Sequence, residues 1–214
     1  MGTLERVRPS FLRVAGYLVL LFQSLPPCGV WTGLMTVPLI SYLVMVVSSL
    51  PVSLPSAFYA FFLSSELFLE RVTILVGLSI LVYSTVYLRA KRKEGLVTSG
   101  PYGLVRHPQY LGTILLTLGL TSWSYWILTH TFGIGFLSPS MTRDVWFLEL
   151  FAYVLLAQIE ELYLSRTYQE PFENYRKKVP FLIPLLRTDR RYLDVLISIL
   201  VPALLLLLLI GIQV

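Results

Sequence analysis

The chain has 214 residues, of which 56% are hydrophobic and 14% are charged, whereas soluble domains are typically about 45–50% apolar and about 25% charged. This composition excludes an ordinary soluble domain and predicts an integral membrane protein. The single cysteine, Cys28, excludes an intrachain disulfide and a multi-cysteine metal site, and with only His107 and His130 as histidines we expect no metal centre. The net charge of +5 does not indicate a nucleic-acid partner, because the basic residues flank apolar segments without a nucleic-acid motif.

Seven apolar segments are candidate membrane helices. In chain order they are residues 11–25, 36–50, 57–69, 72–88, 109–129, 144–163 and 192–212. Several are shorter than the roughly 20 residues that an upright membrane helix needs, so the count falls to five or six if early segments merge or lie at the interface. We predict an all-α fold, a polytopic membrane helix bundle of about seven spans, in which a cytosolic C-terminal connector forms a cofactor pocket.

The distribution of charge predicts the orientation. If the N-terminus is cytoplasmic and all seven segments cross, every Lys and Arg except Arg71 and Arg143 faces the cytoplasm, which is the usual bias of membrane proteins. We divide the chain into N-terminal scaffold helices (residues 1–71), a core that carries the functional site (72–191) and a C-terminal transmembrane helix (192–214).

Two polar clusters stand at the ends of neighbouring segments of this core. Arg106, His107 and Pro108 precede segment 109–129, and Glu160 and Glu161 lie near the end of segment 144–163. An antiparallel pair of helices would bring both clusters to the same side of the bilayer. Pro108 suits the first turn of a helix, whose free N–H groups attract an anion, whereas carboxylates at a helix C-terminus need a cation. The clusters therefore predict a site for a zwitterion whose ammonium or sulfonium supplies that cation.

Two loops flank these clusters. The turn-rich stretch that begins at Thr98 contains Gly100 and Gly103, which let the backbone approach a ligand closely, although a plain surface loop has a similar composition. Further on, Pro180 and Pro184 exclude a helix and predict an extended flap that covers a cofactor or dips into the headgroups.

The motif RHPQYLG, the paired glutamates and a tail of the form Y-x6-Y-x3-VP-x3-P together resemble the isoprenylcysteine carboxyl methyltransferase and phospholipid methyltransferase family of integral membrane enzymes. The similarity covers about ninety residues of the C-terminal half. It implies transfer of the methyl group of S-adenosylmethionine to a lipid or prenylated acceptor that enters from the bilayer, with the cofactor at the cytosolic helix ends.

The resemblance also implies which residues form the site. The cofactor pocket would be lined by Gly100, Pro101, Tyr102, Gly103, His107, Tyr110, Leu111, Gly112, Glu160 and Glu161. The catalytic candidates are Arg106, His107, Glu160 and Glu161. A role for Arg106 as partner of the cofactor carboxylate is our inference from charge. Because neighbouring residues of a helix point about 100° apart, the two glutamates cannot face one pocket equally.

Several functions remain open at this point. The leading one is isoprenylcysteine carboxyl O-methylation; phospholipid N-methylation is an alternative, because the chain has Phe181 where many relatives have arginine and Gln169-Glu170-Pro171-Phe172 where relatives show G-x-E-Y. A membrane sterol-type reductase that uses NADPH ranks lower, because its usual Arg-Asp and Lys-Tyr-Gly motifs are missing. A non-catalytic lipid-binding protein, in which the polar clusters only fix topology, is the last alternative.

Overall fold

A computed structural model describes residues 30–49, 62–63, 65–91, 93, 95–130, 137–188 and 190–213. The chain divides into two compact units, Met1–Val37 and Pro38–Val214. Only the start of one helix is described in the first unit, and the helices that position the predicted site belong to the second. The predicted segment 11–25 and residues 57–61 and 64 of segment 57–69 lie outside the described residues.

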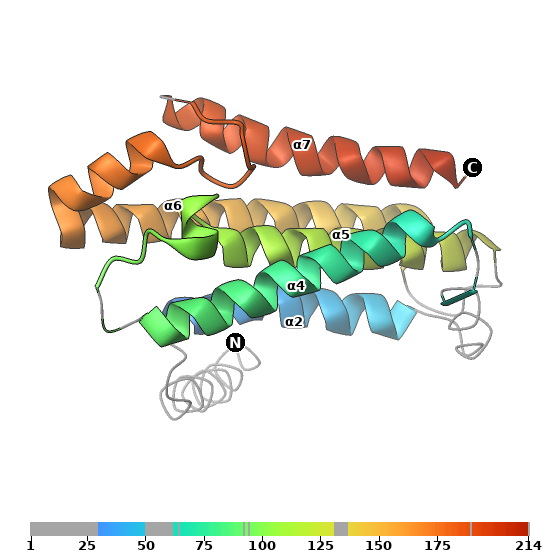
Figure 1. Cartoon of the computed structure of the whole chain (residues 1–214). Coiled ribbons are helices and arrows are strands. Elements are labelled where there is room, and N and C mark those ends of the chain that lie inside the picture. The colour runs from blue at the N-terminus through green and yellow to red at the C-terminus, as the bar shows by residue number, and fades with distance from the viewer. Residues whose placement is uncertain are drawn as a thin grey trace, which may run out of the picture. The chain divides into compact units, whose positions relative to one another are not determined.

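All regular structure among the described residues is helical (Figure 1). The elements in chain order are α2 (Val30–Ser49), α4 (Phe68–Lys91), the short 3-10 helix η2 (Gly100–Gly103), α5 (Pro108–His130), α6 (Pro139–Lys178) and α7 (Arg191–Ile212). The prediction of an all-α chain is confirmed for this part of the sequence.

Within the described ranges, α4, α5 and α7 are long and apolar enough to cross a membrane, and they contain the predicted segments 72–88, 109–129 and 192–212. The outer faces of α4 and α7 expose large apolar side chains such as Leu75, Val82, Leu204 and Leu208, as helices in contact with lipid do. These helices indicate a membrane protein. The predicted total of seven spans and the orientation of the bundle stay predictions.

Helices α4 and α5 cross with their backbones in contact. A Cβ atom added to Gly77 would lie 2.4 Å from the backbone nitrogen of Leu116, and one added to Gly112 would lie 2.6 Å from the backbone nitrogen of Leu81. Small residues at helix contacts allow this close approach inside membranes, where apolar burial contributes little. The glycine pair therefore fixes the position of the first turns of α5 against α4.

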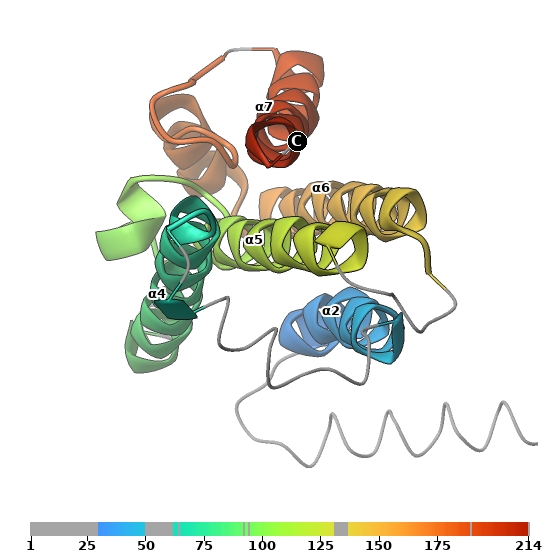
Figure 2. The same cartoon turned by 90° about the vertical axis from the view of Figure 1, so that its right-hand side faces the viewer.

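Helix α5 lies at the centre of the second unit, in contact with α4, α6 and α7 (Figure 2). Its buried side is unusually polar. Tyr42 of α2 donates to the Thr117 carbonyl at 3.0 Å, and its hydroxyl lies 2.5 Å from that of Thr121. Trp146 of α6 donates to the Thr117 hydroxyl at 3.1 Å. These bonds satisfy polar groups that burial would otherwise destabilise.

Helix α6 is longer than the predicted segment 144–163 that it contains, because it continues to Lys178. It bends at Gln169, whose φ of 46° is not helical and which precedes Pro171 by two residues. Beyond Lys178 no residue up to Thr188 is helical, as Pro180 and Pro184 predict. The bend and this return segment bring the chain back toward the start of α5.

Candidate functional site

The approach to α5 is a tight turn built on Gly100. Its φ of 60° is a conformation that side chains rarely adopt, and an added Cβ would lie 2.6 Å from the ring of Tyr87. The Tyr87 hydroxyl lies 2.9 Å from that of Ser99. The turn is therefore held against α4, and it places the buried Tyr102 beside α6, where the Tyr175 hydroxyl donates to the Tyr102 carbonyl at 2.7 Å.

The return segment after α6 pairs with the residues that precede α5. The Arg106 N–H donates to the Pro180 carbonyl at 2.9 Å, and the His107 N–H donates to the Phe181 carbonyl at 3.3 Å. Phe181 and Leu182 are almost completely buried. The sequence predicts an extended flap that covers a cofactor or dips into the headgroups, whereas in the structure these side chains pack inside the protein and hold Arg106 and His107 in place.

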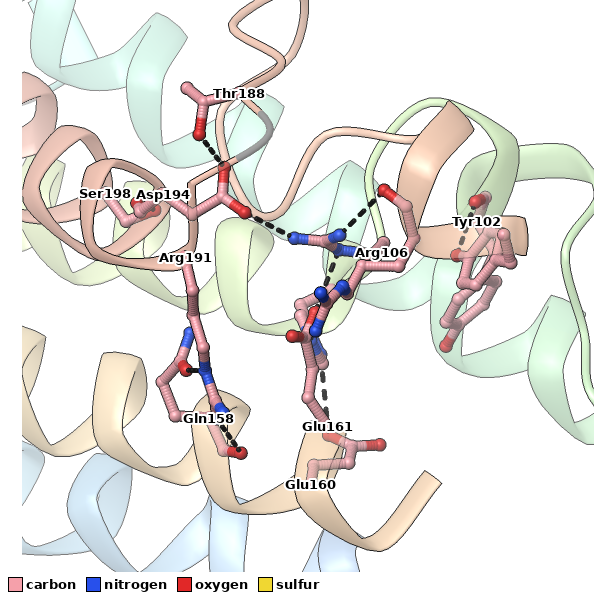
Figure 3. Close-up of polar contacts among 12 residues, drawn as sticks. Tyr102, Arg106, Gln158, Glu160, Glu161, Thr188, Arg191, Asp194 and Ser198 are labelled. Atoms are coloured by element: carbon pink, nitrogen blue, oxygen red, sulfur yellow. Dashed lines mark hydrogen bonds and ion pairs between the residues drawn. The ribbon is translucent and has the colours of Figure 1, made fainter. Parts of the chain in front are cut away.

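Arg106 is the hub of a buried ion-pair cluster (Figure 3). Its Nε lies 2.8 Å from Oε1 of Glu161 on α6, and its Nη2 lies 2.8 Å from Oδ2 of Asp194 on α7. Its Nη1 donates to the Arg176 carbonyl at 2.9 Å, and the guanidinium lies 5.4 Å from the centre of the Phe181 ring. Arg106 thus joins the start of α5, two parts of α6 and the first turn of α7.

His107 lies between the two glutamates of α6. Its Nδ1 is 3.6 Å from Oε2 of Glu160, and its Nε2 is 3.4 Å from Oε1 of Glu161. The ring packs edge-on against Tyr110 and Phe181. Burial alone would lower the pKa of His107, but the two carboxylates outweigh it and raise that pKa to about 9. The imidazole is therefore protonated at neutral pH.

The two glutamates occupy different environments. The Glu161 side chain is 4% exposed and pairs with Arg106 and His107, whereas that of Glu160 is 24% exposed and pairs with His107. This difference follows from the angle of about 100° between neighbouring helical positions. Glu161 is therefore buried inside the cluster, whereas Glu160 is partly exposed at the surface.

The structure thus brings together most of the predicted site residues. Arg106, His107, Glu160 and Glu161 form one cluster, and Tyr110 packs on His107. The turn Gly100–Gly103, with buried Pro101 and Tyr102, precedes them directly. Leu111 is buried one residue after Tyr110.

The resemblance implies that Gly112 lines the cofactor pocket, whereas the structure places it at a helix contact. It lies against the backbone of α4, where its missing side chain is needed for helix contact, so packing alone accounts for a glycine there. Its role in lining a cofactor pocket stays a prediction.

Asp194 is the member of the cluster that sequence reasoning missed. It lies within the predicted span 192–212, in the first turn of α7, and it is 7% exposed. It accepts from Arg106 and from the Thr188 hydroxyl, the latter at 3.1 Å. The available signal was an acidic residue inside an apolar segment, which in membrane proteins marks a paired or functional group.

A cavity of about 210 Å³ adjoins the cluster, between the C-terminal part of α6 and the start of α7. Arg106, Glu161 and Asp194 form its inner wall. In Figure 3, Thr188, Asp194 and Arg191 lie on one side of Arg106 and Tyr102 lies on the other. The cluster therefore separates the cavity from the turn that contains Tyr102.

The sequence matches no family model and no solved structure. It is similar to the nickel-cobalt-cadmium resistance protein NccN of Alcaligenes xylosoxydans xylosoxydans, with 27% identity over 117 residues that cover 52% of this chain and 48% of the relative. It is also similar to the cobalt-zinc-cadmium resistance protein CzcN of Cupriavidus metallidurans, with 28% identity over 111 residues that cover 51% and 44%. The chain spans about half the length of the curated relatives it matches.

Proposed function

We propose that the protein is an integral membrane methyltransferase that transfers the methyl group of S-adenosylmethionine to a lipid-borne acceptor, with isoprenylcysteine carboxyl O-methylation as the leading reaction. The observation that supports the proposal most is the convergence of His107 with Glu160 and Glu161, at 3.6 and 3.4 Å, where α5 begins. Residues 53 or more positions apart in the sequence meet there, beside the glycine turn that the resemblance to the methyltransferase family also includes.

The residues at this end of α5 fit a small zwitterionic methyl donor. The partly exposed Glu160 carboxylate suits an ammonium group. The hydroxyl of Tyr102 is buried and has no hydrogen-bond partner among the described residues, and burial raises the pKa of Tyr102, so that the hydroxyl keeps its proton as a donor. An added Cβ at Gly103 would meet only the Thr98 carbonyl oxygen, at 3.5 Å. The turn therefore leaves its backbone accessible.

When bound, S-adenosylmethionine supplies the electrophilic methyl group, and the protein supplies alignment and exclusion of water. In this proposal Glu160 holds the ammonium group and Tyr102 hydrogen-bonds to the donor. His107 is protonated at neutral pH and so fixes the two carboxylates instead of accepting a proton. A carboxylate acceptor needs no base, whereas an ammonium acceptor must lose a proton, for which Glu160 is the candidate.

Arg106 takes a positioning role in this proposal. Its three guanidinium nitrogens already contact Glu161, Asp194 and the Arg176 carbonyl, so a cofactor carboxylate would have to displace one of them. Its role as carboxylate partner stays a prediction.

The predicted orientation is likewise part of the proposal: about seven spans, with the N-terminus and this site cytoplasmic. Basic Lys177, Arg190 and Arg191 near the site favour that side.

Binding of S-adenosylhomocysteine to the full chain in detergent micelles, measured by titration calorimetry, tests the donor site. Replacing Glu160 with Gln removes the charge that faces the ammonium group, so we expect affinity to fall about tenfold, the effect of one charge-assisted hydrogen bond. Asp144→Asn, an exposed change at the other end of α6, is the matched control. Unchanged affinity in both Glu160→Gln and Glu161→Gln would contradict the proposal.

The same preparation distinguishes the other functions. Methyl-labelled cofactor incubated with lipid extracts identifies the acceptor, and a labelled carboxyl ester or a labelled amine separates isoprenylcysteine from phospholipid methylation. Stabilisation by NADPH alone would favour the reductase. No response to either cofactor would favour a non-catalytic lipid-binding protein.

The names of the two relatives favour a second candidate, a part in resistance to cobalt and cadmium, which both names contain. It is compatible with methyl transfer, because a modified lipid or protein could alter tolerance of metals. Expression in a metal-sensitive bacterium tests it by growth on cobalt or cadmium. Protection that Glu160→Gln abolishes would connect resistance with the proposed site, and protection that survives would separate the two functions.

A further inference from the structure

The cavity between α6 and α7 has a chemistry of its own. Its lining includes four cationic residues, Arg106, Arg176, Lys177 and Arg191, and two anionic ones, Glu161 and Asp194. Formal charges therefore leave two positive charges in excess. His107, Glu160 and Tyr102, which the proposed donor site uses, do not line it.

The cations of this cavity differ in their burial and in their ion-pair partners. Arg106 is buried and pairs with both acids of the wall, so these three groups together carry one negative charge. Arg176 has a side chain that is 37% exposed and contacts Glu173 only at 3.5 Å. Arg191 contacts Gln158, which is neutral, and Lys177 is exposed. Three partly or fully exposed cations thus line the cavity, and one of them, Arg176, is paired with an acid outside the lining, Glu173.

The place of the cavity in the bundle indicates what reaches it. Arg191 is the first residue of α7, a helix long and apolar enough to span a membrane, so the opening lies at the depth where such a helix leaves the bilayer. Basic pockets between membrane helices at this depth bind the phosphates of lipid headgroups. Arginine pairs with phosphate through two parallel hydrogen bonds, and a phosphate ester has enough acceptor oxygens for several cations.

We propose that this cavity binds the phosphate ester of a membrane lipid headgroup or of a soluble phosphorylated compound, with Arg176, Lys177 and Arg191 as its direct partners. The buried pair of Arg106 and Asp194 forms the floor and holds α7 against α6. This site adjoins the donor site, since Arg106 and Glu161 belong to both, but its three direct partners lie outside the donor site and it does not rest on the proposed methyl transfer.

Three soluble probes test the proposal on the full chain in maltoside micelles, with thermal unfolding followed by tryptophan fluorescence. They are dioctanoyl phosphatidic acid, dioctanoylglycerol, which has the same tails and no phosphate, and glycerol 3-phosphate, which has no tails. We expect dioctanoyl phosphatidic acid to raise the Tm and dioctanoylglycerol to leave it nearly unchanged. Lys177→Gln and Arg191→Gln should each weaken this response about tenfold in probe concentration, whereas Arg143→Gln, 18 residues before Glu161 on α6, should not.

The responses to the three probes identify the source of the phosphate and test whether the cavity binds it. A response to dioctanoyl phosphatidic acid alone supports a lipid headgroup as the source of phosphate, and a response to glycerol 3-phosphate supports a soluble source. Equal responses to dioctanoyl phosphatidic acid and dioctanoylglycerol, or an undiminished response in Lys177→Gln and Arg191→Gln, would overturn the proposal. Binding of S-adenosylhomocysteine should be retained in Lys177→Gln, so a failure at either site is distinguishable from a failure at the other.

Discussion

The two ends of α5 are both tied to α7 through buried carboxylates, but by different chemistry. At the start of α5, Arg106 pairs with Asp194 and Glu161, each at 2.8 Å. Toward its other end, Ser122 donates to Oε1 of Glu70 on α4 at 2.9 Å, and Gln213, just after α7, donates to the same oxygen at 2.7 Å. The first end joins opposite full charges, and the second joins one acid to neutral donors.

This difference shows which end a charged ligand can engage. At the first end the side-chain contacts of Arg106 and His107 with the acids join opposite charges, so an ionic ligand or a change of protonation alters the balance. At the second end a single carboxyl group accepts hydrogen bonds from two neutral side chains, so no opposite charge is needed there. We therefore interpret the second end as a tether of three helices and the first as the functional end.

The largest effect that the comparison predicts is that of Arg106→Ala. Removing the guanidinium leaves Glu161 and Asp194 buried without their shared cation, which typically costs about 3–5 kcal/mol in the free energy of unfolding. Denaturant titration in mixed micelles measures it. The control is Arg143→Ala, which removes a half-buried arginine that pairs with its neighbour Asp144. Equal stability of the two variants would show that the charged end is no stronger than a surface ion pair.

Much of the charged end was predictable from local sequence signals. Pro108 predicts the first turn of α5, where the structure has it, and the ends of segments 109–129 and 144–163 predict that His107 and the glutamates meet. These features depend on where helices begin and end and on the direction of the chain, which can be predicted from the apolar segments of the sequence.

What the sequence did not predict depends on contacts between helices. Asp194 meets Arg106 because α7 packs against α5, and a glycine is needed at position 112 because the α4 backbone at Gly77 and Leu81 lies against it. Phe181 is buried because the return segment pairs with the backbone of Arg106 and His107. No local pattern contains such pairings.

A smaller effect separates the two ends by pH. The pKa of His107 rises from its ordinary value of 6.5 to about 9 through Glu160 and Glu161, so its contribution to stability is complete below about pH 6.5 and is lost as the pH rises through 9. Between pH 7 and 9 we expect a loss on the order of 2 kcal/mol in the free energy of unfolding. His107→Gln is the control, and the same loss in that variant would assign the pH dependence to other groups.

The smallest effect is expected from Glu70→Gln, and the same change at Glu161 provides the matching variant at the charged end. An amide oxygen at position 70 still accepts from Ser122 and Gln213, so we expect a loss of about 1 kcal/mol or less. Glu161→Gln should cost more, because Arg106 and His107 then lose a buried counter-charge. Thermal unfolding of both variants in the same micelles measures the difference. A larger loss at position 70 would reverse the assignment, because it would make the far end of α5 the one that depends on charge.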